Sequence, residues 1–190
     1  MSSLIDHYEA TVGPIESGWH SDIKGVSIVR IRCSVLHGVM MYATLGLSRH
    51  VLALPDGRTI RMELLALSAS SFDEACGKRW ASVMDQIATG IVHSHNAPLL
   101  GNFYGPAGPM FEGKKLEALY VANPMVLPEA FWDSDLEEGA PVFFAWLVPL
   151  YAAEAAYRQR HGWSKLEDEL ERQDLDLFDL DRASLVLPST

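Results

Sequence analysis

The chain has 190 residues, of which 48% are hydrophobic and 21% are charged, and its formal net charge is −10. This length and composition predict one globular domain with enough apolar residues for a core. The negative charge disfavours nucleic acid and anionic membranes as partners, because both repel an acidic surface, but it is compatible with a basic protein partner.

Features of the ends, of the apolar runs and of the cysteines indicate a soluble, cytoplasmic protein. The N-terminal segment MSSLIDHYEATVG contains acidic residues and lacks the apolar run of a signal peptide. The most apolar run, PVFFAWLVPLYAAEAAY, is interrupted by a proline and is shorter than the about 18 apolar residues of a membrane span. Cys33 and Cys76 are far apart and form no CxxC motif, so we expect reduced thiols.

In the first half of the chain, the patterns predict a short helix, three strands and a long helix. Residues 3–13 have helical spacing, and residues 25–33, 39–48 and 58–68 have the β-branched residues and alternation of strands. A Pro-Asp-Gly turn at 55–57 predicts a hairpin-like return. Ser71 and Glu74 match a capping box before a helix over 72–94.

In the second half, a Gly- and Pro-rich loop over 97–115 precedes strands at 116–124 and 142–150, separated by an acidic connection at 128–141. Helices are predicted over 151–162 and over 164–173, with Ser164 as the cap of the second. The tail is expected to pack four apolar side chains onto the sheet: Leu175, Leu177, Phe178 and Leu180. Because helices and strands are mixed without a regular βαβ period, we predict an α+β fold with a mixed or antiparallel sheet packed by helices.

Two acidic residues lie in apolar surroundings and are predicted to be buried. Glu63 shares one face of its strand with Leu65 and Leu67, and Glu154 follows the apolar strand at 142–150. A buried carboxylate needs a partner or a shifted pKa. We expect an ion pair with an arginine, such as Arg30 or Arg182, and assign Glu63, Glu154 and Arg182 to a structural polar network.

An enzymatic alternative is a small metal-dependent hydrolase that uses His93 and His95 with Glu63 or Glu154. The two histidines lie at the end of a predicted helix, so a third ligand would have to come from elsewhere. The Gly46-Leu47-Ser48 sequence lacks the second glycine of a nucleophile elbow. The preferred interpretation therefore has no catalytic residue, no metal and no cofactor.

Two kinds of surface are candidates for binding a protein partner. The long loop carries aromatic residues that we expect to be exposed, and two C-terminal segments are rich in acids. The predicted partner-binding residues are Phe103, Tyr104, Phe111, Asp135, Glu137, Glu138, Glu167, Asp168, Glu171 and Asp174.

An ordered set of short motifs resembles the suppressor of fused family. The segments are YATLGLS (42–48), RMELLALS (61–68), VFFAWLVPLYAAEAAY (142–157), HGWSKLEDEL (161–170) and LFDLDRASLV (177–186). The residues that carry the resemblance are Gly46-Leu47-Ser48, Glu63, Pro149, Glu154, His161-Gly162, Asp179 and Arg182. The set occurs in the family's order over about residues 25 to 187, which we take as the core of one domain over residues 1–190.

The resemblance implies an α+β domain without known catalysis. Animal relatives sequester a transcription factor with the help of a second domain, for which this chain has no room, so that function is not carried over. The chain is similar to single-domain bacterial members, which include immunity proteins that neutralise toxins. The resemblance thus implies a non-catalytic protein-binding domain that neutralises a toxin through occlusion, and the acidic net charge is compatible with a basic toxin.

Overall fold

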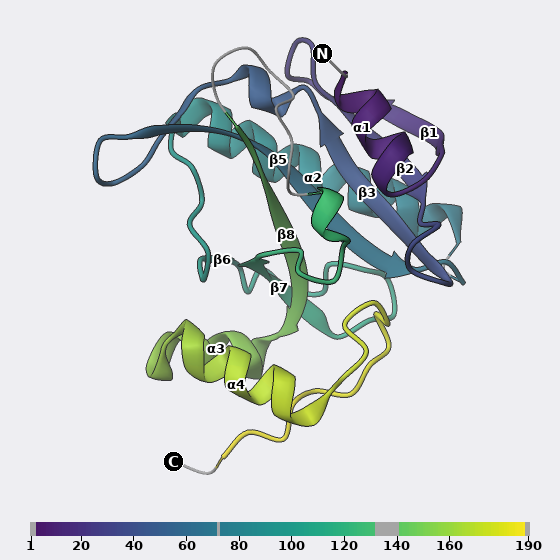
Figure 1. The fold of residues 1–190 in the computed structure, drawn as a ribbon. Helices are drawn as coiled ribbons and strands as arrows, with labels where there is room; N and C mark the ends of the chain where they lie inside the picture. Colours follow the sequence, from purple (N-terminus) through teal and green to yellow (C-terminus); the bar gives the residue numbers. More distant parts are fainter. Residues whose placement is uncertain (1–2, 72, 132–140, 189–190) are drawn as a thin grey trace.

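The computed structural model describes residues 3–71, 73–131 and 141–188, and these residues form a mixed sheet of eight strands with four α-helices (Figure 1). The strands are β1 (Ile15–His20), β2 (Ser27–Arg32), β3 (Val39–Leu45), β4 (Leu52–Ala53), β5 (Thr59–Ala69), β6 (Phe103–Tyr104), β7 (Leu116–Ala122) and β8 (Val142–Tyr151). The helices are α1 (Leu4–Thr11), α2 (Glu74–Ser94), α3 (Ala152–His161) and α4 (Trp163–Gln173), with short 3₁₀ helices η1 (Leu47–Arg49) and η2 (Glu129–Phe131). The predicted α+β class is confirmed.

The sheet has the order β1-β2-β3-β5-β8-β7-β6, and β4 pairs with β5 off this path. Neighbouring strands are antiparallel except for β5 and β8, which are parallel. The long strands β5 and β8 therefore form the centre of the sheet. Because the sheet is covered on both sides here, both strands are apolar on both faces, as their sequences predict.

The two faces of β5 contribute to two separate hydrophobic cores. Leu65 and Leu67 lie in the core that contains Tyr8 of α1 and Phe131 of η2. Met62, Leu64 and Ala66 lie in the other core, which contains Trp80 and Met84 of α2. Figure 1 shows α1 and η2 on one side of the sheet and α2 on the other. This arrangement places Glu63, which alternates with Met62 and Leu64, on the face of α1.

The predicted long strands are present, whereas the three shortest or most exposed strands were missed. In β1, only Ile15 and Trp19 are even partly buried, and the edge strand contains Gly18. Strands β4 and β6 have two residues each. Such segments show too little apolar alternation to be recognised from sequence.

Two predicted helix caps are wrong. The N-cap of α2 is Asp73, whose side chain accepts a 2.9 Å hydrogen bond from the amide of Cys76, so Ser71 and Glu74 do not form the capping box. Helix α4 begins at Trp163 after Gly162, and Ser164 therefore lies inside its first turn. In both cases the predicted cap lies within two residues of the true boundary, which is the usual error of boundary prediction.

Helices α3 and α4 lie together at one end of the sheet, followed by the C-terminal tail (Figure 1). The four predicted tail residues do pack onto the sheet, with Leu180 buried and the others half-buried. The amide of Ala69 donates a 2.9 Å hydrogen bond to the carbonyl of Phe178, which connects the tail to β5. Within the described part of the chain, no helix has the length and apolar character needed to span a membrane.

Candidate functional site

Glu63 lies within β5 and is fully buried. Its carboxylate accepts hydrogen bonds from Thr44 Oγ1 at 2.5 Å and from the backbone amides of Gly46 and Ser48, each at 3.0 Å. The amide of Leu47 adds a longer hydrogen bond of 3.3 Å. The carboxylate thus satisfies amides at the start of η1, which have no partner within the helix, and connects the end of β3 to β5.

The partners of Glu63 differ from those predicted. Burial raises the pKa of Glu63 to about 7, while the hydrogen bonds from Thr44, Ser48 and Gly46 oppose this rise. Among the described residues, its hydrogen-bond partners are hydroxyl and amide groups, so the predicted arginine partner is wrong. The turn after β3 supplies backbone donors instead, and every residue type except proline carries such a donor.

Gly46 makes this turn possible. It has a φ of 101°, in the left-handed region that favours glycine, and a Cβ at this position would lie 2.5 Å from the carbonyl oxygen of Gly25. The Gly-Leu-Ser motif therefore forms an amide cradle for a carboxylate and has a structural role.

Glu154 and Arg182 form a separate buried ion pair. Arg182 Nη1 and Nη2 donate to the two carboxylate oxygens of Glu154 at 2.8 and 2.7 Å. The same carboxylate accepts hydrogen bonds from the amides of Tyr151 and Leu185, and Arg182 also donates to the carbonyl of Pro149 at 2.9 Å. This pair therefore holds the tail against the start of α3. No hydrogen bond within the described residues joins it to Glu63, so the single predicted network is two networks.

The residues of the alternative hydrolase site do not come together. His93 is in the last turn of α2 and His95 follows it, both exposed, whereas Glu63 and Glu154 are buried and hydrogen-bonded to other groups. Over residues 3–71, 73–131 and 141–188, no group of three or more His, Cys, Asp or Glu side chains could hold a metal ion. The described geometry gives no support to the hydrolase alternative.

Four predicted acids form an exposed surface on and after α4, which we call the α4 acidic surface. It consists of Glu167, Asp168, Glu171 and Asp174. Helix α4 places Leu166 and Leu170 against the core, and the acids occupy the remaining sides of the helix. Three further predicted acids, Asp135, Glu137 and Glu138, lie outside the described residues.

The loop over 97–115 differs from the exposed aromatic surface that was predicted. Phe111 is only 4% exposed and packs against Trp80 with ring centroids 4.9 Å apart, so its assignment to the partner-binding surface is wrong. The adjacent apolar residues Met110 and Phe111 could have indicated that this loop folds back onto the core. Phe103 and Tyr104 are half-buried and form β6 at the sheet edge.

Sequence reasoning missed an exposed apolar surface beside α4. Trp163 is 50% exposed, and Leu99 and Leu100 are 39% and 51% exposed. Trp163 packs directly over Gly101, where a Cβ would lie 2.8 Å from the indole. Tryptophan is enriched at the centres of protein interfaces, so the position of Trp163 directly before a predicted polar helix was the signal available in the sequence.

Comparison with known proteins agrees with the predicted resemblance. Residues 22–183 match the model of the suppressor of fused protein (SUFU) family. The chain belongs to the suppressor of fused family. A relative from Bacillus subtilis (strain 168), Immunity protein YqcF, is 29% identical over 173 residues, which cover 86% of this chain and 83% of the relative.

Solved SUFU structures have the same fold. A SUFU homologue from Neisseria gonorrhoeae FA 1090 superposes with a TM-score of 0.74 at 16% identity, over 96% of this chain and 94% of the homologue. A chain of the Sufu–Fu complex gives a TM-score of 0.56 at 15% identity, over 96% of this chain and 81% of that one. Drosophila Suppressor of Fused gives 0.55 at 16% identity, over 83% of this chain but 42% of the Drosophila chain. The chain thus matches the suppressor of fused family in sequence, and its fold agrees with that of the solved SUFU structures.

Proposed function

We propose that this member of the suppressor of fused family is a non-catalytic immunity protein that binds a protein toxin and covers its active surface. The observation that carries the proposal is the similarity to Immunity protein YqcF along most of both chains. The presence of the same fold in the Sufu–Fu complex is further support for a protein partner. In this proposal, Glu63, Glu154 and Arg182 maintain the scaffold and take no part in binding.

The α4 acidic surface is the proposed contact region, and its charge indicates a basic toxin. Asp168 pairs with Lys165 at 3.1 Å, and the neighbouring Glu169 pairs with Arg172 at 2.5 Å. Glu171 and Asp174 belong to no ion pair among the residues that the structure describes. Their uncompensated charge would attract a basic partner and accelerate its association.

Neighbouring groups extend this contact region. Glu167 accepts a 2.8 Å hydrogen bond from the hydroxyl group of Tyr120, which fixes the carboxylate at the end of the surface near β7. Trp163, four residues earlier on α4, is half-exposed. An aromatic anchor beside a charged rim is the usual arrangement of a tight protein interface.

A pull-down from the lysate of the producing cell tests the proposal. Three baits are compared: the wild-type chain, a variant E167Q/E171Q/D174N, and a control variant E9Q/D22N/E129Q. The control removes the same three charges from exposed positions elsewhere. Mass spectrometry then identifies the retained proteins.

We expect one stoichiometric, lysine- and arginine-rich protein with the wild-type and control baits. It should be lost with the first variant and at high salt, and it should be toxic when expressed alone. Absence of any stoichiometric partner would contradict the proposal. Equal retention by all three baits would show that the acidic surface is not the contact region.

A further inference from the structure

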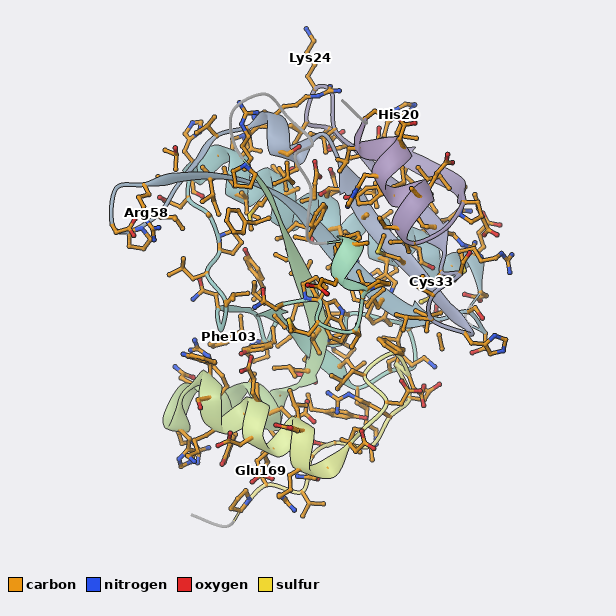
Figure 2. The ribbon with its side chains drawn as sticks, in the orientation of Figure 1. His20, Lys24, Cys33, Arg58, Phe103 and Glu169 are labelled. Carbon is orange, nitrogen blue, oxygen red and sulfur yellow. The ribbon has the colours of Figure 1, made fainter. Side chains whose placement is uncertain are left out.

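A groove of about 610 Å³ lies outside both buried networks. It is formed by the second half of α2, the segment over residues 96–104, and Arg158 of α3. Figure 2 shows Phe103, one of its lining residues, directly above α3. The volume is within the range of about 300–1,000 Å³ that is typical of small-molecule sites.

Arg158 brings a positive charge to this groove. Its guanidinium carbon lies 5.2 Å from the ring centroid of Phe103, and its buried Nε has no hydrogen-bond partner in the part of the chain that the structure describes. Among the described residues, Arg158 takes part in no ion pair. Desolvating part of a guanidinium without an acceptor is unfavourable, so a ligand that supplies an acceptor would be stabilised here.

Two acids that could form an ion pair with Arg158 are bonded to other residues. Glu154 precedes it by four residues, which is the ordinary spacing of a helical ion pair. In this fold, however, both oxygens of Glu154 bond to Arg182. Glu167, a second acid on this side of the molecule, accepts its hydrogen bond from Tyr120. Arg158 is thus available for an external anion.

Uncharged donors complete the polar part of the groove. Burial raises the pKa of Tyr104 to about 12, so its phenol remains protonated and can donate. Asn102 Oδ1 accepts a 2.9 Å hydrogen bond from the amide of Leu99, which leaves the two N–H donors of Asn102 for another acceptor. Among the described residues, no carboxylate lines the groove, so its polar groups favour an anion.

The remaining wall is apolar and suits the body of a small organic molecule. Ile87 and Ile91 of α2 line the groove together with Ala97, Pro98 and Phe103. We propose that this groove binds a small organic carboxylic acid, with its carboxylate on Arg158 and its apolar or aromatic body against this wall. Arginine suits this ligand because its planar fork binds a carboxylate through two parallel hydrogen bonds. The inference goes beyond the proposed function and does not depend on it.

Titration of the full chain with sodium phenylacetate, followed by ¹H–¹⁵N NMR, tests this proposal. Phenylacetamide is the neutral probe of the same shape. The variants are R158Q, which removes the charge, R158K, which keeps the charge but loses the fork, and R160Q, a control at an exposed arginine of the same helix. Thermal unfolding of each variant verifies that it is folded.

Phenylacetate should shift the resonances of residues 96–104 and the Arg158 Nε–H saturably. Affinity should fall about tenfold or more for phenylacetamide and for R158Q, by a smaller factor for R158K, and less than twofold for R160Q. The proposal is overturned if phenylacetate causes no saturable shift, or if phenylacetate and phenylacetamide bind equally. It is also overturned if only a capped Phe-Asp peptide binds, since the groove would then be a protein-docking site. Should R158Q not fold, the acid–amide comparison and R158K decide.

Discussion

Glu63 is a buried carboxylate whose negative charge is stabilised by backbone amides and a hydroxyl group. The amides of Gly46, Leu47 and Ser48 converge on it, and Thr44 Oγ1 both donates to it and accepts from the amide of Leu64 at 2.8 Å. Because these dipoles offset only part of the desolvation penalty, the pKa of the group rises to about 7. A residue with a scaffold role therefore titrates close to neutral pH.

Replacing Glu63 with glutamine should remove a pH-dependent part of the folding stability. The folded-state pKa of about 7 is above the ordinary value of 4.5, so the folded state binds this proton more tightly than the unfolded state. Stability from this group is therefore fully present below about pH 4.5 and is lost as the pH rises through about 7, by up to about 3 kcal/mol. Denaturant unfolding of the wild type and E63Q at pH 5 and pH 8 measures this loss.

The stability of the wild type must be compared with that of E63Q at each pH, because His7 also contributes to the pH dependence of unfolding. Burial lowers the pKa of His7 below 6.5, so its contribution to stability has the opposite sign and increases as the pH rises towards 6.5. This contribution is common to the wild type and E63Q and cancels in their difference. A stability difference between the two proteins that is constant from pH 5 to pH 8 would contradict the assignment of a raised pKa to Glu63.

Replacing only Arg182 in its ion pair with Glu154 should lower the free energy of unfolding more than the replacement of a charged pair by two uncharged residues would suggest. In the variant R182M, the buried Glu154 carboxylate loses two hydrogen bonds, and we expect a loss of about 3–5 kcal/mol. The double variant E154Q/R182M has no uncompensated charge and should lose less than the sum of the single variants. Strict additivity in denaturant unfolding would show that the pair is not coupled.

At the level of the elements, the N-cap of α2 can be tested by mutation. Asp73 caps this helix in the structure, whereas the sequence predicted a capping box with Ser71. D73A should destabilise the protein by about 1 kcal/mol, because the amide of Cys76 loses its acceptor. S71A should change the stability by less than about 0.5 kcal/mol, because Ser71 does not cap α2. Thermal and denaturant unfolding check both values, and a larger effect of S71A would favour the capping box predicted from sequence.

The sequence predicts those elements in which the spacing of apolar side chains reflects the faces that are buried. In β5, Met62 and Leu64 face one core and Leu65 and Leu67 face the other, and this pattern is visible without a structure. The partners of Glu63 could not be predicted, because most of the donors are backbone amides, which any residue type except proline can supply. The salt bridge between Glu154 and an arginine was predictable, and Arg182 was among the candidate partners. Arg158, however, lies four residues after Glu154, at the ordinary spacing of a helical ion pair.

At the scale of the whole molecule, the positions of the acidic residues say more about a binding surface than the net charge does. Residues 163–190 contain eight acids and three basic residues, and four of the exposed acids form the α4 acidic surface, while Asp176 and Asp181 lie on the tail. The two cores fix the sheet, and the pair between Glu154 and Arg182 fixes the tail on which part of this charge lies. The fold thus presents a rigid acidic surface at one end of the sheet.

If this surface attracts a basic toxin, association must depend strongly on salt. We expect the association rate constant to fall about tenfold or more between about 0.05 and 0.5 M salt, with a smaller change in the dissociation rate constant. Stopped-flow or surface plasmon measurements with the toxin from the pull-down check this expectation. The variant E167Q/E171Q/D174N should have a slower and less salt-dependent association, and an association rate constant independent of salt would contradict electrostatic attraction.

The survival of cells that express the retained toxin together with this chain tests the immunity function directly. We expect that the wild type and the control E9Q/D22N/E129Q restore growth, while E167Q/E171Q/D174N lowers survival at least about tenfold at equal expression. Failure of the wild-type chain to restore growth would contradict the immunity function. Full protection by E167Q/E171Q/D174N would contradict the acidic surface as its binding site.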